Sequence, residues 1–298
     1  MKSDVMPFIE FNITQKCNYC CEYCSQGFMN KKEPEKLFHA SDEVIEGFIN
    51  LLKRIGSEYE VSLIGGEPFC HPKFIETSGK IAKLGNNIIV YTNLSFPVSS
   101  FEKLIDATGE NLKLIHGALH VSEIKDLDKN IEDVIKIKTL LKKGSAIRVV
   151  AVVTEENFEL LKSVETRLLA GGVEFIYIRL IKPNGEISFY SKEIEDYLKE
   201  REHKYNHDML LAREIDTSKV LCWAGVKLLH VLANGNIMRC WTPQHNKNFQ
   251  YLGNVAEPSS INLLKGPMPC FAKSCHCQHP TARNAYFEVG EIACTKSN

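Results

Sequence analysis

The chain has 298 residues, 44% of them apolar, which is enough to bury a sizeable core in one barrel-sized domain or in a domain with an appendage. Its formal net charge of -1, with lysine and arginine spread along the whole length, argues against a broad basic surface that would bind nucleic acid. The N-terminus carries charged residues, and no apolar run reaches the roughly 18 residues that a membrane helix needs. We therefore expect a cytoplasmic protein whose substrates are small molecules or peptides.

The first part of the chain alternates short apolar runs with amphipathic stretches. Residues 8–13 alternate as a half-buried strand does, and residues 41–55 indicate a helix with Ser41 as its N-cap and Gly56 after its end. The later pattern predicts helices at 74–84, 98–107, 130–143 (closed by Gly144) and 158–169, and strands at 61–64, 88–92, 112–119, 146–153 and 173–180.

This alternation predicts an α/β fold. Strands that alternate with helices imply right-handed crossovers and a parallel sheet. Six strand-helix units are fewer than the eight of a closed barrel, so we predict a partial (β/α)6 TIM-like barrel. Its chemistry is then expected at the carboxyl ends of the strands.

The composition changes after residue 183. Residues 190–216 are charged and indicate a helix, and residues 228–232 and 237–240 indicate a β-hairpin about an Asn234-Gly235 turn. Six of the eleven cysteines lie between Cys222 and Cys294. We therefore predict a barrel over 1–190, a connecting helical segment over 191–220 and a small cysteine-rich domain over 221–298.

Four cysteines lie directly after the first predicted strand, three of them in the order Cys17-x3-Cys21-x2-Cys24. Reducing conditions disfavour disulfides, so clustered thiols are better explained as metal ligands. Three thiolates from one loop can hold three corners of an iron-sulfur cube and leave the fourth iron open to another ligand. A zinc ion held by the four thiols, Cys20 included, is the alternative, although such sites more often use two separated pairs.

The stretch Gly65-Gly66-Glu67-Pro68 follows the second predicted strand. The two glycines allow the backbone to approach a ligand closely, and Glu67 can accept hydrogen bonds from an ammonium group. Pro68 ends the strand. An ordinary turn is the alternative explanation.

The cysteine loop, the order of strands and helices and the Gly-Gly-Glu-Pro turn together resemble the radical S-adenosylmethionine (SAM) enzymes, over roughly residues 8–183. The resemblance implies that Cys17, Cys21 and Cys24 hold a 4Fe–4S cluster whose open iron binds SAM. An external donor such as flavodoxin or ferredoxin would supply the electron that cleaves SAM to methionine and a 5′-deoxyadenosyl radical. The residues implied at the cofactor are Tyr23, Gly65, Gly66, Glu67, Pro68 and Asn93.

Several residues near the predicted strand ends have two explanations each. Asn93 lies where the family usually has Thr-Asn-Gly, but Leu94 replaces the glycine and leaves the role of Asn93 open. His120 could face the cavity or be structural, and Arg148 and Arg179 could bind a carboxylate or form structural salt bridges. Cys20 and Cys70 are interpreted as spare thiols, with His71 beside Cys70 a weak ligand candidate, and no catalytic side chain is assigned.

The C-terminal cysteines resemble a second type of site. Cys222-x12-Gly235-x4-Cys240 is similar to the opening of the auxiliary-cluster domains called SPASM and Twitch, in which a hairpin separates the first two ligands. This implies one auxiliary 4Fe–4S cluster, and a structural zinc site is the alternative. The expected ligands are Cys222, Cys240, Cys275 and Cys277, with Cys270 or Cys294 as substitutes.

The resemblance implies an enzyme that abstracts a hydrogen atom and oxidises, joins or rearranges its substrate with help from the auxiliary cluster. About seven residues precede the first strand, which leaves no room for a leader-peptide recognition domain and favours a small polar metabolite. A maturase of ribosomal peptides, a non-catalytic iron-sulfur or zinc protein and an RNA-modifying radical enzyme are the alternatives.

Overall fold

The computed structural model describes residues 6–24, 34–181, 187–201, 220–240, 250–270 and 286–288. Its strands are β1 (Phe8–Thr14), β2 (Glu60–Gly65), β3 (Ile88–Thr92), β4 (Leu112–Leu119), β5 (Ala146–Val153), β6 (Glu174–Arg179), β7 (Val220–Cys222), β8 (Leu228–Val231), β9 (Asn236–Met238), β10 (Tyr251–Asn254), β11 (Met268–Pro269) and β12 (Tyr286–Glu288). Its α-helices are α1 (Asp42–Ile55), α2 (Phe74–Lys83), α3 (Val98–Thr108), α4 (Leu127–Leu140), α5 (Phe158–Ala170) and α6 (Lys192–Glu200). Short 3-10 helices cover Pro34–Lys36, Pro68–Cys70, Gly109–Asn111 and Pro258–Ser260.

The main sheet has nine strands in the order β10-β9-β8-β1-β2-β3-β4-β5-β6. Strands β1 to β6 run parallel and lie in sequence order, each joined to the next through a helix. Within the described residues the sheet has free edges at β6 and β10, so it is open. The predicted parallel α/β architecture of a partial barrel is therefore confirmed.

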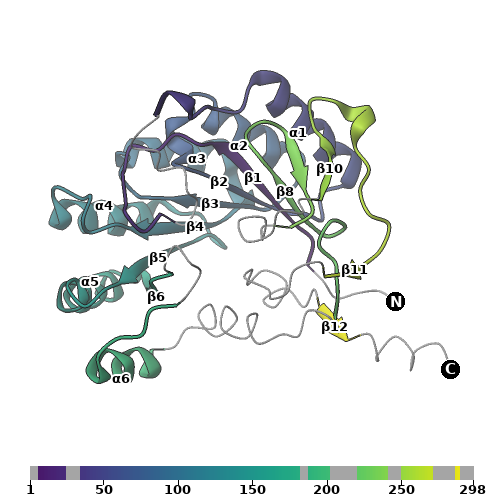
Figure 1. Ribbon diagram of the computed structural model, residues 1–298. Helices are drawn as coiled ribbons and strands as arrows, with labels where there is room; N and C mark the ends of the chain where they lie inside the picture. Colours follow the sequence, from purple (N-terminus) through teal and green to yellow (C-terminus); the bar gives the residue numbers. More distant parts are fainter. Residues whose placement is uncertain are drawn as a thin grey trace.

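Helices α1, α2 and α3 lie side by side over one face of this sheet (Figure 1). Helix α1 begins where Ser41 accepts a hydrogen bond from the Val44 amide and ends at Gly56, whose φ is 99°. Its apolar stripe packs on β1, where the rings of Phe48 and Phe11 stack with centroids 4.2 Å apart. Burying one such side chain contributes about 1.5–3 kcal/mol. No described helix is both long and apolar enough to cross a membrane.

Two predicted helices differ from the structure. Helix α4 begins at Leu127 because the Asp126 carboxylate accepts a hydrogen bond from the Lys129 amide and caps it three residues earlier than expected. It ends at Leu140, so Gly144 lies in the following loop rather than at the helix end. The predicted helix at 190–216 is represented by α6, and residues 202–219 lie outside the described part of the chain.

The predicted hairpin is present, with β8 and β9 antiparallel about Gly235, whose φ is 85°. Its position was not foreseen: β8 lies parallel to β1, so the hairpin and β10 extend the main sheet. Strands β7, β11 and β12 form a separate three-stranded sheet. The proposed domain boundary at residue 221 stays a prediction.

A buried acid fastens α6 to the barrel. Glu165 of α5 accepts hydrogen bonds from the hydroxyls of Tyr177 and Tyr197, at 2.9 and 2.6 Å, and from Arg201 at 3.1 Å. The Arg201 guanidinium also lies 3.7 Å from the centroid of the Tyr197 ring. Helix α6 therefore docks through a charged hydrogen-bond network as well as through apolar contact.

The substitution Tyr197→Phe tests this network. It removes the 2.6 Å hydrogen bond to Glu165 but keeps the ring that packs against Phe158. Because the lost bond is to a charged group in a half-buried site, we expect the free energy of unfolding to fall by about 1.5–3 kcal/mol. Urea denaturation with an unchanged m-value measures this loss, and an unchanged midpoint would contradict the role of Glu165.

Candidate functional site

The cysteine loop begins directly after β1, at the edge of the sheet where the parallel strands end. Carboxyl ends of parallel strands share one edge, so the segments that follow β2, β3 and β4 meet this loop. The structure brings Glu67, Asn93 and His120 against it, each just past the end of its strand. These residues therefore lie together at the strand ends, and their role as the reaction site stays a prediction.

Gly65 and Gly66 hold the end of β2 against the entry to the loop. A Cβ atom at Gly65 would lie 2.3 Å from the Thr14 carbonyl oxygen, and one at Gly66 would lie 2.4 Å from that of Lys16. The Gly66 and Glu67 amides donate to these same two oxygens at 2.8 and 2.9 Å. The glycines thus allow the backbone of the turn to lie close to the backbone at the entry to the cysteine loop. The sequence pattern had suggested instead that they allow the backbone to approach a ligand.

Glu67 is fully buried, and its carboxylate already has three donors. Oε1 accepts from the Phe69 amide and the Thr92 hydroxyl, and Oε2 accepts from the Asn93 amide at 2.6 Å. Burial nevertheless raises the pKa of Glu67 to about 7. Glu67 therefore ties the ends of β2 and β3 together, and its predicted contact to a SAM ammonium group stays a prediction.

Asn93 directs its amide at the cysteine loop. Its Nδ2 donates to Asn18 Oδ1 at 2.9 Å and lies 3.7 Å from the Cys17 sulfur, while its Oδ1 accepts from Ser95. Hydrogen bonds to a thiolate sulfur tune an iron-sulfur cluster and orient its ligand. The structure thus assigns Asn93 a contact to Cys17, and its predicted contact to the cofactor is untested.

Tyr23 and His120 pack together beside the loop. The Tyr23 hydroxyl lies 3.2 Å from His120 Nδ1, and the two rings are 5.7 Å apart. Burial lowers the pKa of His120 to about 4, so the imidazole is neutral near pH 7. Glu123 on the same segment accepts a hydrogen bond from the Cys20 amide at 3.1 Å. His120, for which the sequence left two explanations open, thus contacts the loop, and Glu123 is a contact that the sequence pattern did not indicate.

The three thiols that would hold a cluster differ in exposure. Cys17 is exposed, Cys24 is intermediate and Cys21 is buried. Although Cys17 is exposed as a residue, partial burial of its thiol raises its pKa to about 11, and burial raises that of Cys21 to about 12. Both thiols are therefore protonated near pH 7, and binding iron must displace their protons.

The three cysteines of the loop suit an iron-sulfur cluster by their chemistry, because thiolate is the usual ligand of such clusters. Among the described residues, no group of three or more His, Cys, Asp or Glu side chains is placed to hold a single ion. The ligands of a cubane bind three separate irons and need not converge on one point. Cys17, Cys21 and Cys24 would hold the cluster, with the Asn93 amide beside the first of them.

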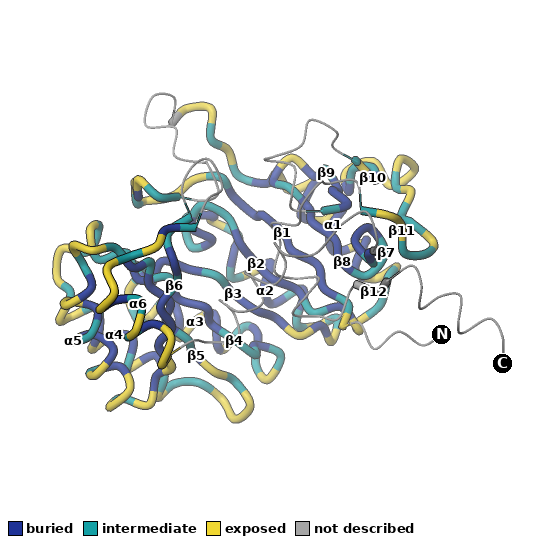
Figure 2. Tube along the Cα trace, turned by 60° about the horizontal axis from the view of Figure 1, so that its bottom comes forward, coloured by how far each residue is buried: buried dark blue, intermediate teal, exposed yellow. Residues whose placement is uncertain are grey.

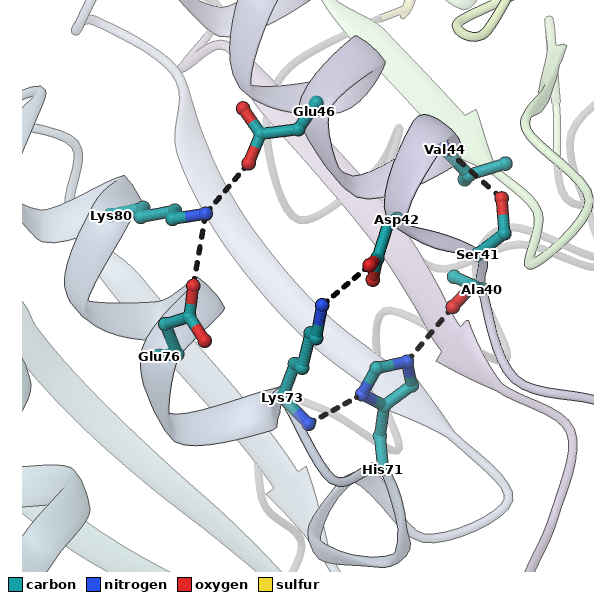
Figure 3. A network of polar contacts seen from close by, with 9 residues as sticks. All are labelled: Ala40, Ser41, Asp42, Val44, Glu46, His71, Lys73, Glu76 and Lys80. Atoms are coloured by element: carbon teal, nitrogen blue, oxygen red, sulfur yellow. Dashed lines mark hydrogen bonds and ion pairs between the residues drawn. The ribbon is translucent and has the colours of Figure 1, made fainter.

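Cys70 and His71 follow the glycine turn and have different environments. The Asn18 amide hydrogen-bonds to the Cys70 thiol, so this cysteine contacts the loop and is not remote from it. His71 is buried, donates from Nε2 to the Ala40 carbonyl and accepts from the Lys73 amide, both at 3.0 Å (Figure 3). Both ring nitrogens are engaged, so His71 is structural and the weak ligand prediction for it was wrong.

Arg148 and Arg179 form salt bridges within the protein. Arg148 donates to Glu174 at 2.7 Å, and Arg179 makes two hydrogen bonds to Glu195 of α6, at 2.7 and 2.8 Å. Two-point pairing of this kind is the strongest geometry for an arginine and a carboxylate. The structural alternative for both arginines is therefore the one that the structure supports.

The C-terminal cysteines are only partly described. Cys222 and Cys240 lie in one small apolar cluster, and Cys270 follows β11, which pairs with β7 beside Cys222. Cys275, Cys277 and Cys294 lie outside the described residues. Buried Arg239, which the sequence pattern did not indicate, donates to the carbonyls of Ala224, Met268 and Pro269 and thereby links the backbone segments next to Cys222 and Cys270.

The substitution Glu67→Gln tests whether the Glu67 carboxylate stabilises the protein when SAM is absent. It places an amide NH2 where protein donors already point, so the free energy of unfolding of the SAM-free protein should fall by at least about 1.5–3 kcal/mol. Glu76→Gln, on an exposed ion pair with Lys80, is the matched control and should change it by about 1 kcal/mol or less. Equal unfolding midpoints for both variants would show that Glu67 has no structural role.

Leu94 provides a second test. It has a φ of 58°, the left-handed conformation that favours glycine, which explains why the family motif ends in glycine. However, its buried side chain fills the space over Gly117. Leu94→Gly relieves about 1–2 kcal/mol of backbone strain but loses about 2–5 kcal/mol of packing, so we expect net destabilisation in thermal unfolding. A higher melting temperature would show that strain outweighs packing.

This chain is similar to known proteins in sequence and in fold. Residues 11–145 match the sequence model of the Radical SAM superfamily. Crystal structures of Streptococcus suis SuiB superpose with TM-scores of 0.56, for the complex with S-adenosylmethionine, and 0.55, for the complex with the precursor peptide SuiA. Both share 15% identity and cover 85% of this chain, and the chain spans 64% and 63% of those SuiB chains.

An uncharacterized protein of Methanocaldococcus jannaschii, MJ0907, is 25% identical over 278 residues, which are 88% of this chain and 93% of that protein. The matched family segment runs from β1 to the loop before β5 and includes the cysteine loop, the glycine turn and Asn93. A radical SAM domain implies SAM and a 4Fe–4S cluster as cofactors. The chain therefore carries a domain of the Radical SAM superfamily over residues 11–145.

Proposed function

We propose that this protein is a radical SAM enzyme that abstracts a hydrogen atom from a small polar metabolite and oxidises or rearranges it, with help from one auxiliary iron-sulfur cluster. The observation that carries the proposal is the placement of Cys17, Cys21 and Cys24 at the strand ends, with Asn93 against Cys17. The cluster, when bound, supplies the single electron that cleaves SAM.

The protein's own residues orient this site. The Glu67 amide and the Gly66 amide fasten the glycine turn to Lys16 and Thr14, immediately before the first ligand. The Asn93 side-chain amide orients Cys17, and neutral His120 orients the Tyr23 hydroxyl, which lies 3.2 Å from its Nδ1. These contacts fix the loop before any cofactor binds, which reduces the ordering cost of binding.

The auxiliary cluster is the second part of the proposal. Cys222 and Cys240 lie on either side of the β8–β9 hairpin and belong to one small apolar cluster, and Cys270 directly follows β11, which pairs with β7. We assign Cys222 and Cys240 as ligands, with Cys275 and Cys277 completing the set and Cys270 or Cys294 as substitutes. An external electron donor such as flavodoxin or ferredoxin is the expected partner.

Reductive cleavage of SAM tests the enzyme assignment. Anaerobically reconstituted protein with dithionite should release 5′-deoxyadenosine, and Cys17→Ala should release none above background. Cys20→Ala is the matched control, because Cys20 is an exposed cysteine of the same loop and is not an assigned ligand. Absence of 5′-deoxyadenosine from the wild type with its clusters intact would favour a non-catalytic iron-sulfur protein.

Iron content tests the auxiliary site. Two cubane clusters predict about eight irons per chain, and Cys17→Ala and Cys222→Ala should each retain about four. About four irons together with stoichiometric zinc in the wild type would instead support a structural zinc site.

Supplying a ribosomal peptide in place of polar metabolites tests the alternative that the protein is a peptide maturase, because only the true substrate should stimulate 5′-deoxyadenosine formation.

A further inference from the structure

The face of the sheet opposite to α1 carries a row of polar side chains. Phe11 of β1 stacks on Phe48 of α1, so its neighbours Glu10 and Asn12 point to the other face of the strand. Register pairs Glu10 with Ser62 of β2 on one side and with His230 of β8 on the other. All four residues therefore share one face across three adjacent strands.

These side chains are buried, yet two of them carry an oxygen that has no hydrogen-bond partner in the described part of the chain. Asn12 is 3% exposed and Ser62 is 0% exposed, in strands that are buried along their length (Figure 2). Asn12 Oδ1 and Ser62 Oγ make no hydrogen bond to any part of the chain that the structure describes. A buried polar atom left unpaired destabilises a protein, and most buried polar atoms have a partner, so two unpaired oxygens on one face indicate a candidate ligand site.

The charged neighbours of this pair already have partners. Glu10 Oε1 lies 3.2 Å from His230 Nδ1, and both residues are buried. The open hydrogen-bonding capacity therefore belongs to an amide and a hydroxyl, which are neutral groups. A ligand hydroxyl both donates and accepts, so it can pair with Ser62 and with the Asn12 amide in either of its orientations.

The location suits a substrate. Asn12 lies two residues before the end of β1, and the cysteine loop begins directly after that strand. In barrels of this kind the carboxyl ends of the strands carry the active site. Enzymes also retain groups that lower the stability of the ligand-free protein at sites where a ligand binds, because the bound ligand supplies the missing interactions.

We propose that Asn12 and Ser62, on the inner face of β1 and β2, bind hydroxyl groups of a neutral polyhydroxylated substrate. This inference rests on the proposed function, because it names the class of metabolite that the enzyme takes. It assigns recognition to strands β1 and β2 rather than to the arginines, which are engaged in salt bridges with Glu174 and Glu195.

The first test is the stability of the reconstituted full-length protein without substrate. Ser62→Ala removes an unpaired hydroxyl, so its melting temperature should equal or exceed that of the wild type. Ser145→Ala is the matched control, because the Ser145 hydroxyl donates to the Leu112 carbonyl at 2.6 Å and its loss should lower the melting temperature. If Ser62→Ala melts as low as Ser145→Ala, Ser62 has a partner such as a structural water, and the proposal is wrong.

The second test uses myo-inositol and D-glucose as probes. Each is titrated into the wild type, Ser62→Ala and Asn12→Leu while binding is measured by calorimetry. We expect at least one polyol to bind the wild type and both variants to bind it at least about tenfold more weakly, as the loss of one buried hydrogen bond implies.

Three results would overturn the proposal. They are no binding of either polyol to the wild type, equal binding to the wild type and both variants, or weaker binding of SAM alone in the variants, which would assign these groups to the cofactor. Neither test measures SAM cleavage, so failure of this inference and failure of the proposed function are separate outcomes.

Discussion

The contact between the end of β2 and the entry to the cysteine loop is the constraint on which the rest of the site depends. Two amides of the glycine turn donate to the carbonyls of Thr14 and Lys16, and either glycine would clash with those carbonyls if it carried a Cβ atom. The same turn then presents Glu67, which accepts from the end of β3. The two backbone hydrogen bonds and the Glu67 carboxylate thus align the ends of β1, β2 and β3 beside Cys17.

Helix contacts and the hydrogen-bond network around Glu165 stabilise the sheet that carries this site. Helix α1 packs on β1, while His71 ties the segment after the glycine turn to Ala40, just before α1. At the other end of the sheet, Glu165 and Arg179 fasten α6 through buried charges. The face of β1 and β2 opposite to α1 differs from these hydrogen-bonded regions. There, Asn12 Oδ1 and Ser62 Oγ have no hydrogen-bond partner among the described residues.

Local elements could be predicted well from the sequence. The bounds of β3, β4 and β5 agree with the apolar runs, because parallel strands buried on both faces give continuous runs of Val, Ile and Leu. The start of α4 was missed because the Asp126 cap competes with the apolar periodicity. The cysteine loop could be placed directly after the first strand, because the spacing of the cysteines and the preceding strand are both local features.

Long-range relations could not be predicted in the same way. Nothing local shows that β8 pairs with β1, that Cys70 reaches the backbone of Asn18 or that Arg239 bonds to the Met268 carbonyl. Each depends on residues that only the fold brings together. The unpaired atoms of Asn12 and Ser62 are likewise invisible in sequence, since polar residues inside strands ordinarily find partners.

The central claim is that the cysteine loop holds a cluster with one iron open to SAM. Electron paramagnetic resonance of the reduced Cys222→Ala protein, which would retain only the loop cluster, tests it most directly. We predict that adding SAM changes the cluster spectrum, because SAM becomes a ligand of the open iron. A spectrum that is identical with and without saturating SAM would contradict the claim.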